Sequence, residues 1–120
     1  MAYKKPVPEK FYKQPWETYL VGGDFSRVLE SGEELVVGDC DITAIDMDDE
    51  SAAPEVLDNS YKQVTTADED DIDVTPVTNG MLMTRIQAGV DLAKYKITFK
   101  GSTNNDNQFE IDTYMNIKDA

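Results

Sequence analysis

The chain has 120 residues, of which 24 are acidic and 11 basic, with no histidine and one cysteine, so its net charge is -13. The missing histidine excludes serine-histidine and cysteine-histidine catalysis, and one cysteine allows neither an internal disulfide nor a thiolate zinc site. The charge opposes binding to nucleic acid or to an anionic membrane surface, so neither partner is expected. No apolar run approaches the roughly 18 residues that would span a bilayer, and residues 1–6 carry no apolar signal core.

The charge is concentrated in the middle of the chain. Residues 1–27 hold five basic and three acidic side chains, and residues 85–120 hold five of each. Residues 28–84, in contrast, hold sixteen acidic side chains and one lysine. The first segment therefore differs from the rest in composition.

That first segment also holds three of the five prolines and six of the eleven aromatic residues. Prolines at this density disfavour a helix or a central strand, so residues 1–23 are predicted to form an extended arm and residues 24–120 one domain. Exposed aromatics on a free tail would leave a large apolar surface in water, so the arm is expected to pack on its own domain or to reach a neighbouring subunit. On its own domain it would cover a sheet edge or the open end of the core. A free disordered tail is the third, less favoured alternative. The predicted anchors are Tyr3, Phe11, Tyr12, Trp16 and Tyr19.

Short strand candidates recur along the chain at the spacing of an all-β sandwich. They cover residues 25–29, 34–37, 41–45, 61–65, 72–77 and 81–88. Turn-forming pairs separate them, and Asn79-Gly80 is a strong hairpin signal because both residues tolerate positive φ.

The clearest pattern is a hairpin near the C-terminus. Residues 93–100 alternate between apolar residues and a face with three lysines, residues 109–118 also alternate, and the polar residues 101–108 lie between them. The predicted inner face of the second strand consists of Phe109, Ile111, Met115 and Ile117. On the outer face the lysines can meet Glu110 and Asp112, for about 0.2 to 1 kcal/mol per pair.

Two acidic clusters, residues 46–51 and 68–73, raise the question of metal binding or catalysis. An EF-hand loop starting at Asp46 would need glycine at its sixth position and glutamate at its twelfth, where the chain has Ser51 and Leu57. Acid-base catalysis would need one carboxyl group in an apolar pocket, and solvated loops do not provide it. The favoured interpretation is exposed loops that keep the protein soluble, so no cofactor, no metal and no catalytic residue are predicted.

Two further functional interpretations of the residues are disfavoured. The carboxylates cluster instead of following a long phosphate-like track, which argues against imitation of DNA. Cys40 lies between Asp39 and Asp41, whose negative charges disfavour a reactive thiolate, so a buried structural cysteine is predicted instead.

The order of features resembles small bacteriophage and prophage proteins with an immunoglobulin-like β-sandwich, encoded among head and tail genes. The resemblance runs from the Asp24-Phe25 pair and the Ser31-Gly32-Glu33 step to an ending with Gly89, the strand 95–98, the polar loop 101–108 and a last alternating strand 110–117. It covers residues 24–118, and its motifs are short. The chain departs from the pattern by lacking a glycine pair near Gly89, by having Leu92 where glycine is common, and by its longer N-terminal segment.

The resemblance implies an all-β, immunoglobulin-like β-sandwich in a non-enzymatic virion structural protein, and the composition of residues 1–23 adds an extended N-terminal arm to this fold. Such a protein would be a capsid decoration or cement protein or a head-tail accessory component, made in the bacterial cytoplasm and present in multiple copies in the virion. Its partners would be capsid, neck or tail proteins, bound through the arm. The alternative function is a generic immunoglobulin-like module that recognises a soluble protein or a cell-surface glycan.

Overall fold

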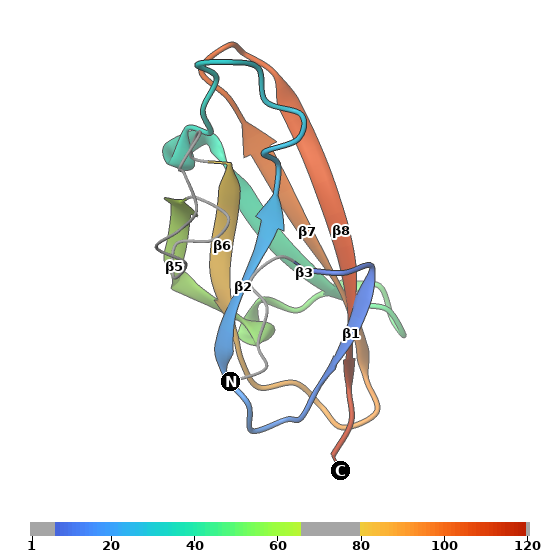
Figure 1. Cartoon of the computed structure of the whole chain (residues 1–120). Coiled ribbons are helices and arrows are strands. Elements are labelled where there is room, and N and C mark those ends of the chain that lie inside the picture. The colour runs from blue at the N-terminus through green and yellow to red at the C-terminus, as the bar shows by residue number, and fades with distance from the viewer. Residues whose placement is uncertain (1–6, 66–79, 120) are drawn as a thin grey trace.

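In the computed structural model of the chain, residues 7–65 and 80–119 are described. They form two β-sheets and two short 3-10 helices, η1 (Val37–Asp39) and η2 (Pro54–Val56), and include no α-helix (Figure 1). The larger sheet has the order β1 (Lys10–Lys13), β8 (Gln108–Ile117), β7 (Lys94–Ser102), β3 (Asp41–Asp46) and β4 (Ser51–Ala52). The smaller sheet has the order β2 (Tyr19–Asp24), β6 (Met81–Ile86) and β5 (Leu57–Thr65). The architecture is consistent with a β-sandwich, and the described residues include no helix long and apolar enough to cross a membrane.

The hydrophobic core lies between the two sheets and draws on both of them. Its largest fully buried apolar side chains include Leu82 and Ile86 from β6, Ile97 and Phe99 from β7, and Met115 from β8. The sheets approach closely where β2 crosses β7, because a Cβ atom on Gly23 would lie only 2.9 Å from Cγ of Phe99. Glycine at this position therefore permits the packing that any larger residue would disturb.

The predicted C-terminal hairpin is confirmed. Strands β7 and β8 pair antiparallel over their whole length, with Thr98 opposite Asp112 and Lys100 opposite Glu110. On the outer face, Lys96 Nζ lies 3.8 Å from the Asp112 carboxylate, and Thr98 Oγ1 donates a hydrogen bond of 2.8 Å to the same carboxylate. Alternation of apolar and charged residues predicts the two strands, their buried faces and the meeting of opposite charges on the outer face, and the structure adds the exact register.

The predicted arm is not separate from the sandwich in the described residues. Strand β1 pairs in parallel with β8, and β2 pairs antiparallel with β6 along its whole length, through Asp24. The prolines do not prevent this because Pro8 and Pro15 flank β1 and leave its donors in place. The division at residue 23 therefore falls inside β2, and the fold matches the alternative in which this segment covers a sheet edge.

Other strand predictions had mixed outcomes. Strands β3 and β6 coincide closely with the predicted ones, and β5 contains residues 61–65 but begins earlier. Residues 25–29 form turns instead, because the Asp24 side chain accepts a hydrogen bond from the Ser26 N–H and ends β2. Residues 34–37 contribute only a single bridge, between Leu35 and Thr103. The prediction for 72–77 lies outside the described residues.

Candidate docking surface at one end of the sandwich

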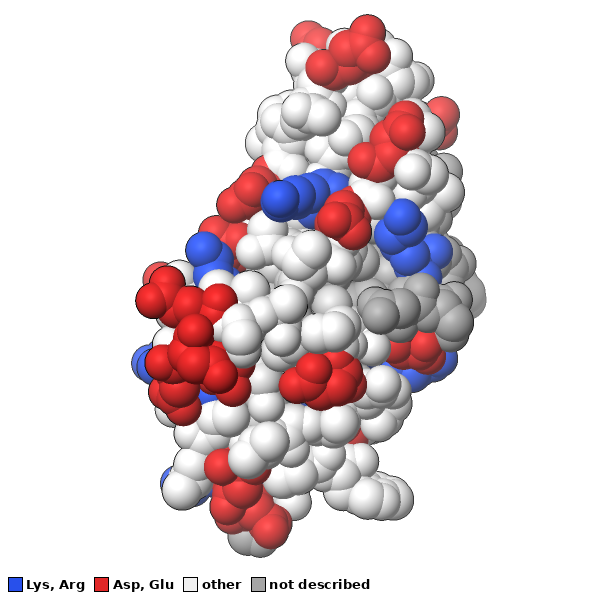
Figure 2. Space-filling view, turned by 180° about the vertical axis from the view of Figure 1, so that it is seen from behind, with Lys and Arg blue, Asp and Glu red and all other residues white. Residues whose placement is uncertain are grey.

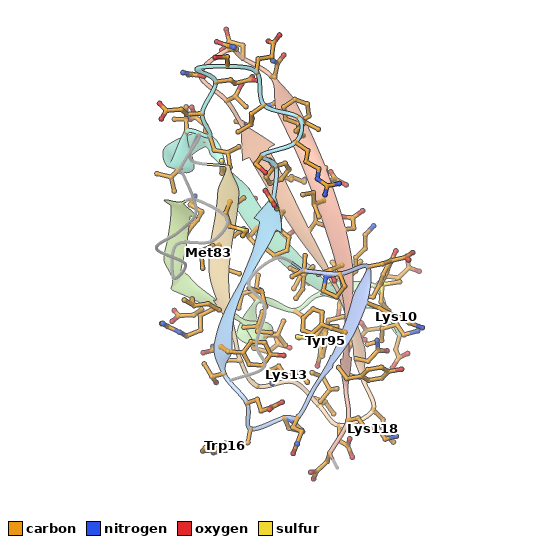
Figure 3. The ribbon with its side chains drawn as sticks, in the orientation of Figure 1. Lys10, Lys13, Trp16, Met83, Tyr95 and Lys118 are labelled. Atoms are coloured by element: carbon orange, nitrogen blue, oxygen red, sulfur yellow. The ribbon has the colours of Figure 1, made fainter. Side chains whose placement is uncertain are left out.

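The most exposed large apolar side chains lie towards one end of the molecule. Trp16 is 91% exposed, Leu92 80%, Val90 67% and Tyr12 65%. Trp16 lies in the turn between β1 and β2, and Val90 and Leu92 lie in the β6–β7 loop at the same end, with Tyr12 on the adjoining β1 (Figures 1 and 3). We call these four residues and their two loops the Trp16 end. A group of large apolar side chains facing solvent is typical of a docking surface.

The β1–β2 turn presents Trp16 through a short hydrogen-bonded sequence. The Glu17 N–H donates to the Gln14 carbonyl over 3.1 Å, which closes a turn with Pro15 and Trp16 at its centre. Proline fits the first central position of such a turn because its φ is already fixed. The Glu17 carboxylate also accepts a hydrogen bond of 2.8 Å from the Gln14 N–H. The tryptophan therefore stands at the tip of an ordered turn.

A buried lysine ties this turn to the β6–β7 loop. Lys13 is 1% exposed, and its Nζ donates to the carbonyls of Gln14, Pro15 and Ala88 (Figure 3). Three carbonyls satisfy all three donors of an ammonium group. Burial lowers the pKa of Lys13, and the nearby Glu17 carboxylate partly opposes this effect. The lysine joins two loops that are distant in sequence.

The β6–β7 loop has an unusual backbone that turns Leu92 outward. Ala88 and Leu92 both have positive φ, 52° and 71°. The Tyr95 hydroxyl, on a side chain that is 1% exposed, accepts a hydrogen bond of 3.1 Å from the Val90 N–H. Positive φ in a residue other than glycine costs about 1 kcal/mol or more and persists only where neighbouring contacts hold it. The loop is therefore fixed in a conformation that exposes its apolar side chains.

The structure divides the predicted anchors into two groups. Tyr12 and Trp16 are exposed, whereas Phe11 and Tyr19 are partly buried and pack against the core. Tyr3 lies outside the described residues. The sequence prediction missed Val90 and Leu92, although two apolar residues in a segment between strands were an available signal.

The opposite end of the sandwich is organised around a buried carboxylate, and we call it the Glu33 end. The Glu33 carboxylate accepts hydrogen bonds from Thr103 Oγ1 at 2.6 Å, Asn107 Nδ2 at 2.8 Å and the Glu30 N–H at 2.9 Å. These bonds lower its pKa. They also join the β2–β3 loop to the β7–β8 loop, so one buried charge holds this end together.

The Glu33 end has a polar surface. Its exposed apolar side chains, Val28, Val36 and Val37, are each less than half exposed. A shallow depression of about 470 Å³ lies beside it, with Asp39, Asp41, Lys100 and Glu110 among its lining residues. Polar, open depressions of this kind are unlike the apolar pockets that hold small ligands.

The acidic cluster 46–51 forms the turn between β3 and β4, and it contributes to the dense red area in Figure 2. Its carboxylates are used within the turn, since Asp46 accepts from the Asp48 N–H and Asp49 accepts from both the N–H and the hydroxyl of Ser51. In residues 7–65 and 80–119, no three acidic or cysteine residues are grouped closely enough to hold a metal ion. The cluster 68–73 lies outside this part of the chain.

Cys40 is buried, as predicted. It is 3% exposed, and its Sγ accepts a hydrogen bond of 3.4 Å from the Ser102 N–H.

The comparisons with known proteins give no match: no protein-family model, curated protein or solved structure matches this chain.

Proposed function

We propose that this chain is a non-enzymatic bacteriophage virion protein, a capsid decoration or head-tail accessory component, that attaches to a neighbouring subunit through the Trp16 end. The observation that carries this proposal is a tryptophan that is 91% exposed on an ordered turn, next to a second exposed apolar loop. The phage assignment comes from the sequence resemblance.

The strand order supports an immunoglobulin-like sandwich. That fold places strands B, E and D in one sheet and C, F and G in the other, with an extra C′ strand in some members. Counted along the chain, the strands β2, β3, β4 and β5 correspond to B, C, C′ and D, and β6, β7 and β8 correspond to E, F and G. The smaller sheet, β2-β6-β5, then has the order B-E-D, and the larger sheet contains G-F-C-C′ as β8-β7-β3-β4. The first strand, β1, lies beside β8, while the preceding Val7 N–H donates to the Gly22 carbonyl of β2.

A tyrosine near the start of β7 supports the same assignment. Immunoglobulin-like domains often have a tyrosine near the start of strand F whose hydroxyl bonds to the backbone a few residues upstream. Tyr95 does this with the Val90 N–H. Two residues later, where antibody domains have a cysteine, this chain has the fully buried Ile97. Apolar packing there takes the place of an inter-sheet disulfide.

Attachment through the Trp16 end has a favourable energetic basis. Tryptophan is the residue type most typical of binding hot spots, and truncation of such a residue commonly costs about 2 kcal/mol or more. Because the Lys13 contacts already order the two loops, docking would fix few additional degrees of freedom. The fitting partner is a subunit with an apolar pocket for an indole ring.

The net charge of -13 is consistent with copies that do not associate with one another. Like charges on separate copies repel, so each copy is expected to remain monomeric until it meets its site. On a particle, several copies would then be spaced by the lattice of the partner instead of by their own contacts.

The test is cosedimentation with particles that lack the protein, prepared from the phage or prophage that encodes it. Trp16→Ala should bind at least about 30-fold more weakly than the natural chain. Val90→Ala should weaken binding by a smaller factor, whereas Val28→Ala, the same change at the Glu33 end, should leave it unchanged. Binding of Trp16→Ala at full occupancy would contradict the docking surface, and failure of the natural chain to bind any particle component would contradict the virion function.

A further inference from the structure

Strand β8 is much longer than the strand that covers its outer edge. It runs from Gln108 to Ile117, but β1 pairs only with Tyr114 to Ile117 (Figure 1). In the described part of the chain, no backbone hydrogen bond joins the other half of this edge, residues 108–112, to a second strand. We call residues 108–112 on this side the open edge.

The direction of the backbone groups along the open edge follows from the paired half. The Tyr114 N–H donates to the Glu9 carbonyl on the β1 side, whereas the Ile117 N–H donates to the Ala93 carbonyl on the β7 side. Backbone N–H and C=O groups alternate in direction along a strand. The even-numbered residues Gln108, Glu110 and Asp112 therefore point their N–H and C=O groups towards the open edge. They form a row to which another strand can bind.

The core beneath the open edge is incompletely covered. On the inner face of β8, Met115 and Ile117 are 0% and 2% exposed where β1 lies alongside, with Phe11 opposite Met115. Phe109 and Ile111 share this face beside the open edge but are only partly buried. A strand that continued the line of β1 would place its own inner-face side chains beside these two, as β1 places Phe11 beside Met115.

The outer face indicates which kind of strand fits. Glu110 and Asp112 form an acidic row along β8, next to the outer-face lysines of β7, which include Lys96 and Lys100. On the other side of β8, β1 places Lys10 opposite Tyr114, so the charges alternate from strand to strand. A second copy paired symmetrically with the open edge would put Glu110 directly opposite its own counterpart, which is repulsive. Self-pairing is therefore disfavoured.

We propose that the open edge accepts an extended segment of another protein that adds to the sheet beside β8, with apolar residues on its inner face and lysine or arginine on its outer face. Main-chain hydrogen bonds to Gln108, Glu110 and Asp112 supply the attachment, and contacts with Phe109 and Ile111 supply the preference for apolar side chains. This site is separate from the Trp16 end.

A capped peptide of sequence Lys-Val-Lys-Val-Lys, titrated into the full chain, tests the proposal by NMR. The amides of Gln108, Glu110 and Asp112 should shift and become protected from hydrogen exchange, whereas the amides of Phe109 and Ile111, already bonded to β7, should keep their protection. This alternation is specific to strand addition. Absence of the alternation, or shifts confined to the Trp16 end, would overturn the proposal.

Two variants separate backbone pairing from charge. Glu110→Pro removes one outward N–H without removing a β7–β8 hydrogen bond, and it should abolish binding. Glu110→Lys keeps the backbone and should weaken binding about three- to tenfold at low salt. The control, Glu55→Lys, reverses an exposed charge elsewhere and should leave the affinity within about twofold of the natural chain.

If Glu110→Pro fails to fold, Glu110→Lys and the amide pattern of the natural chain still decide the question. Equal weakening by Glu110→Lys and Glu55→Lys would show non-specific attraction and contradict the site. Dimerisation of the natural chain through residues 108–112 would also contradict it, because the occupant would then be a second copy. The Trp16→Ala variant should bind the peptide normally, so this result is independent of the proposed virion function.

Discussion

The two ends of the sandwich use the same device with opposite charge. At the Trp16 end the Lys13 ammonium joins two loops by donating to their carbonyls, and at the Glu33 end a carboxylate joins two loops by accepting from N–H and O–H groups. The difference lies in what each pair of loops exposes, since one end presents Trp16 and Leu92 and the other mainly polar and acidic side chains. Well-fixed loops are therefore found at both ends, and only the exposed apolar side chains distinguish the Trp16 end as a candidate docking surface.

The largest expected effect comes from removing the lysine that holds the Trp16 end. Lys13→Ala leaves the carbonyls of Gln14, Pro15 and Ala88 without their donor, so it should lower the free energy of unfolding by about 3 kcal/mol. Chemical denaturation measures this change. The matched control is Lys10→Ala on the same strand, an exposed lysine whose removal should cost at most about 0.5 kcal/mol. If Lys13→Ala and Lys10→Ala lowered the free energy of unfolding equally, this would contradict the structural role assigned to Lys13.

The Glu33 end should respond to acid. Its hydrogen bonds lower the pKa of Glu33 in the folded state, so the stabilisation they give is present above the ordinary glutamate pKa and is lost as the pH falls through the lowered value. The natural chain should therefore exceed Glu33→Gln in stability at neutral pH, and the difference should shrink on acidification. Denaturation of both proteins across this pH range checks the prediction, and a constant difference would refute it.

A smaller effect is expected where the β6–β7 loop meets the core. Tyr95→Phe removes the acceptor of the Val90 N–H and should cost about 1 to 2 kcal/mol. The matched control is Tyr114→Phe on β8, which also removes a tyrosine hydroxyl but at a partly exposed position, and it should cost less. Hydrogen exchange should also show faster opening of the Val90 amide in Tyr95→Phe, and unchanged protection there would contradict the assigned bond.

Local alternation explains which parts of the fold the sequence could predict. The hairpin of β7 and β8 followed from its apolar and lysine faces and from the turn-forming residues between them. The parallel pairing of β1 with β8 joins segments about a hundred residues apart and leaves no local pattern, so local sequence alone predicts an arm there instead of a strand. Proline density was misleading because only the positions of Pro8 and Pro15, just outside β1, decide whether the strand can form.

The candidate site shows the same division. Residue type draws attention to Trp16 and Tyr12, but it selects Phe11 and Tyr19 equally, and these two pack against the core. Which of these aromatics are exposed depends on the strand pairing of β1 and β2. The contribution of Val90 and Leu92 depends on a loop conformation with positive φ and on its tertiary contact with Lys13, neither of which is encoded by spacing. Burial of Lys13 and Glu33 likewise follows from contacts between distant loops.

The most direct test of the docking surface uses the fact that Trp16 is the only tryptophan in the chain. Replacing it by 5-hydroxytryptophan gives a fluorophore that can be excited separately from the tryptophans of a partner. In the free protein, an added quencher should reach it readily, because the side chain is 91% exposed. On the particle, quenching should fall several-fold. Quenching that is unchanged while the protein remains bound would show that the Trp16 end faces solvent, and would contradict the account.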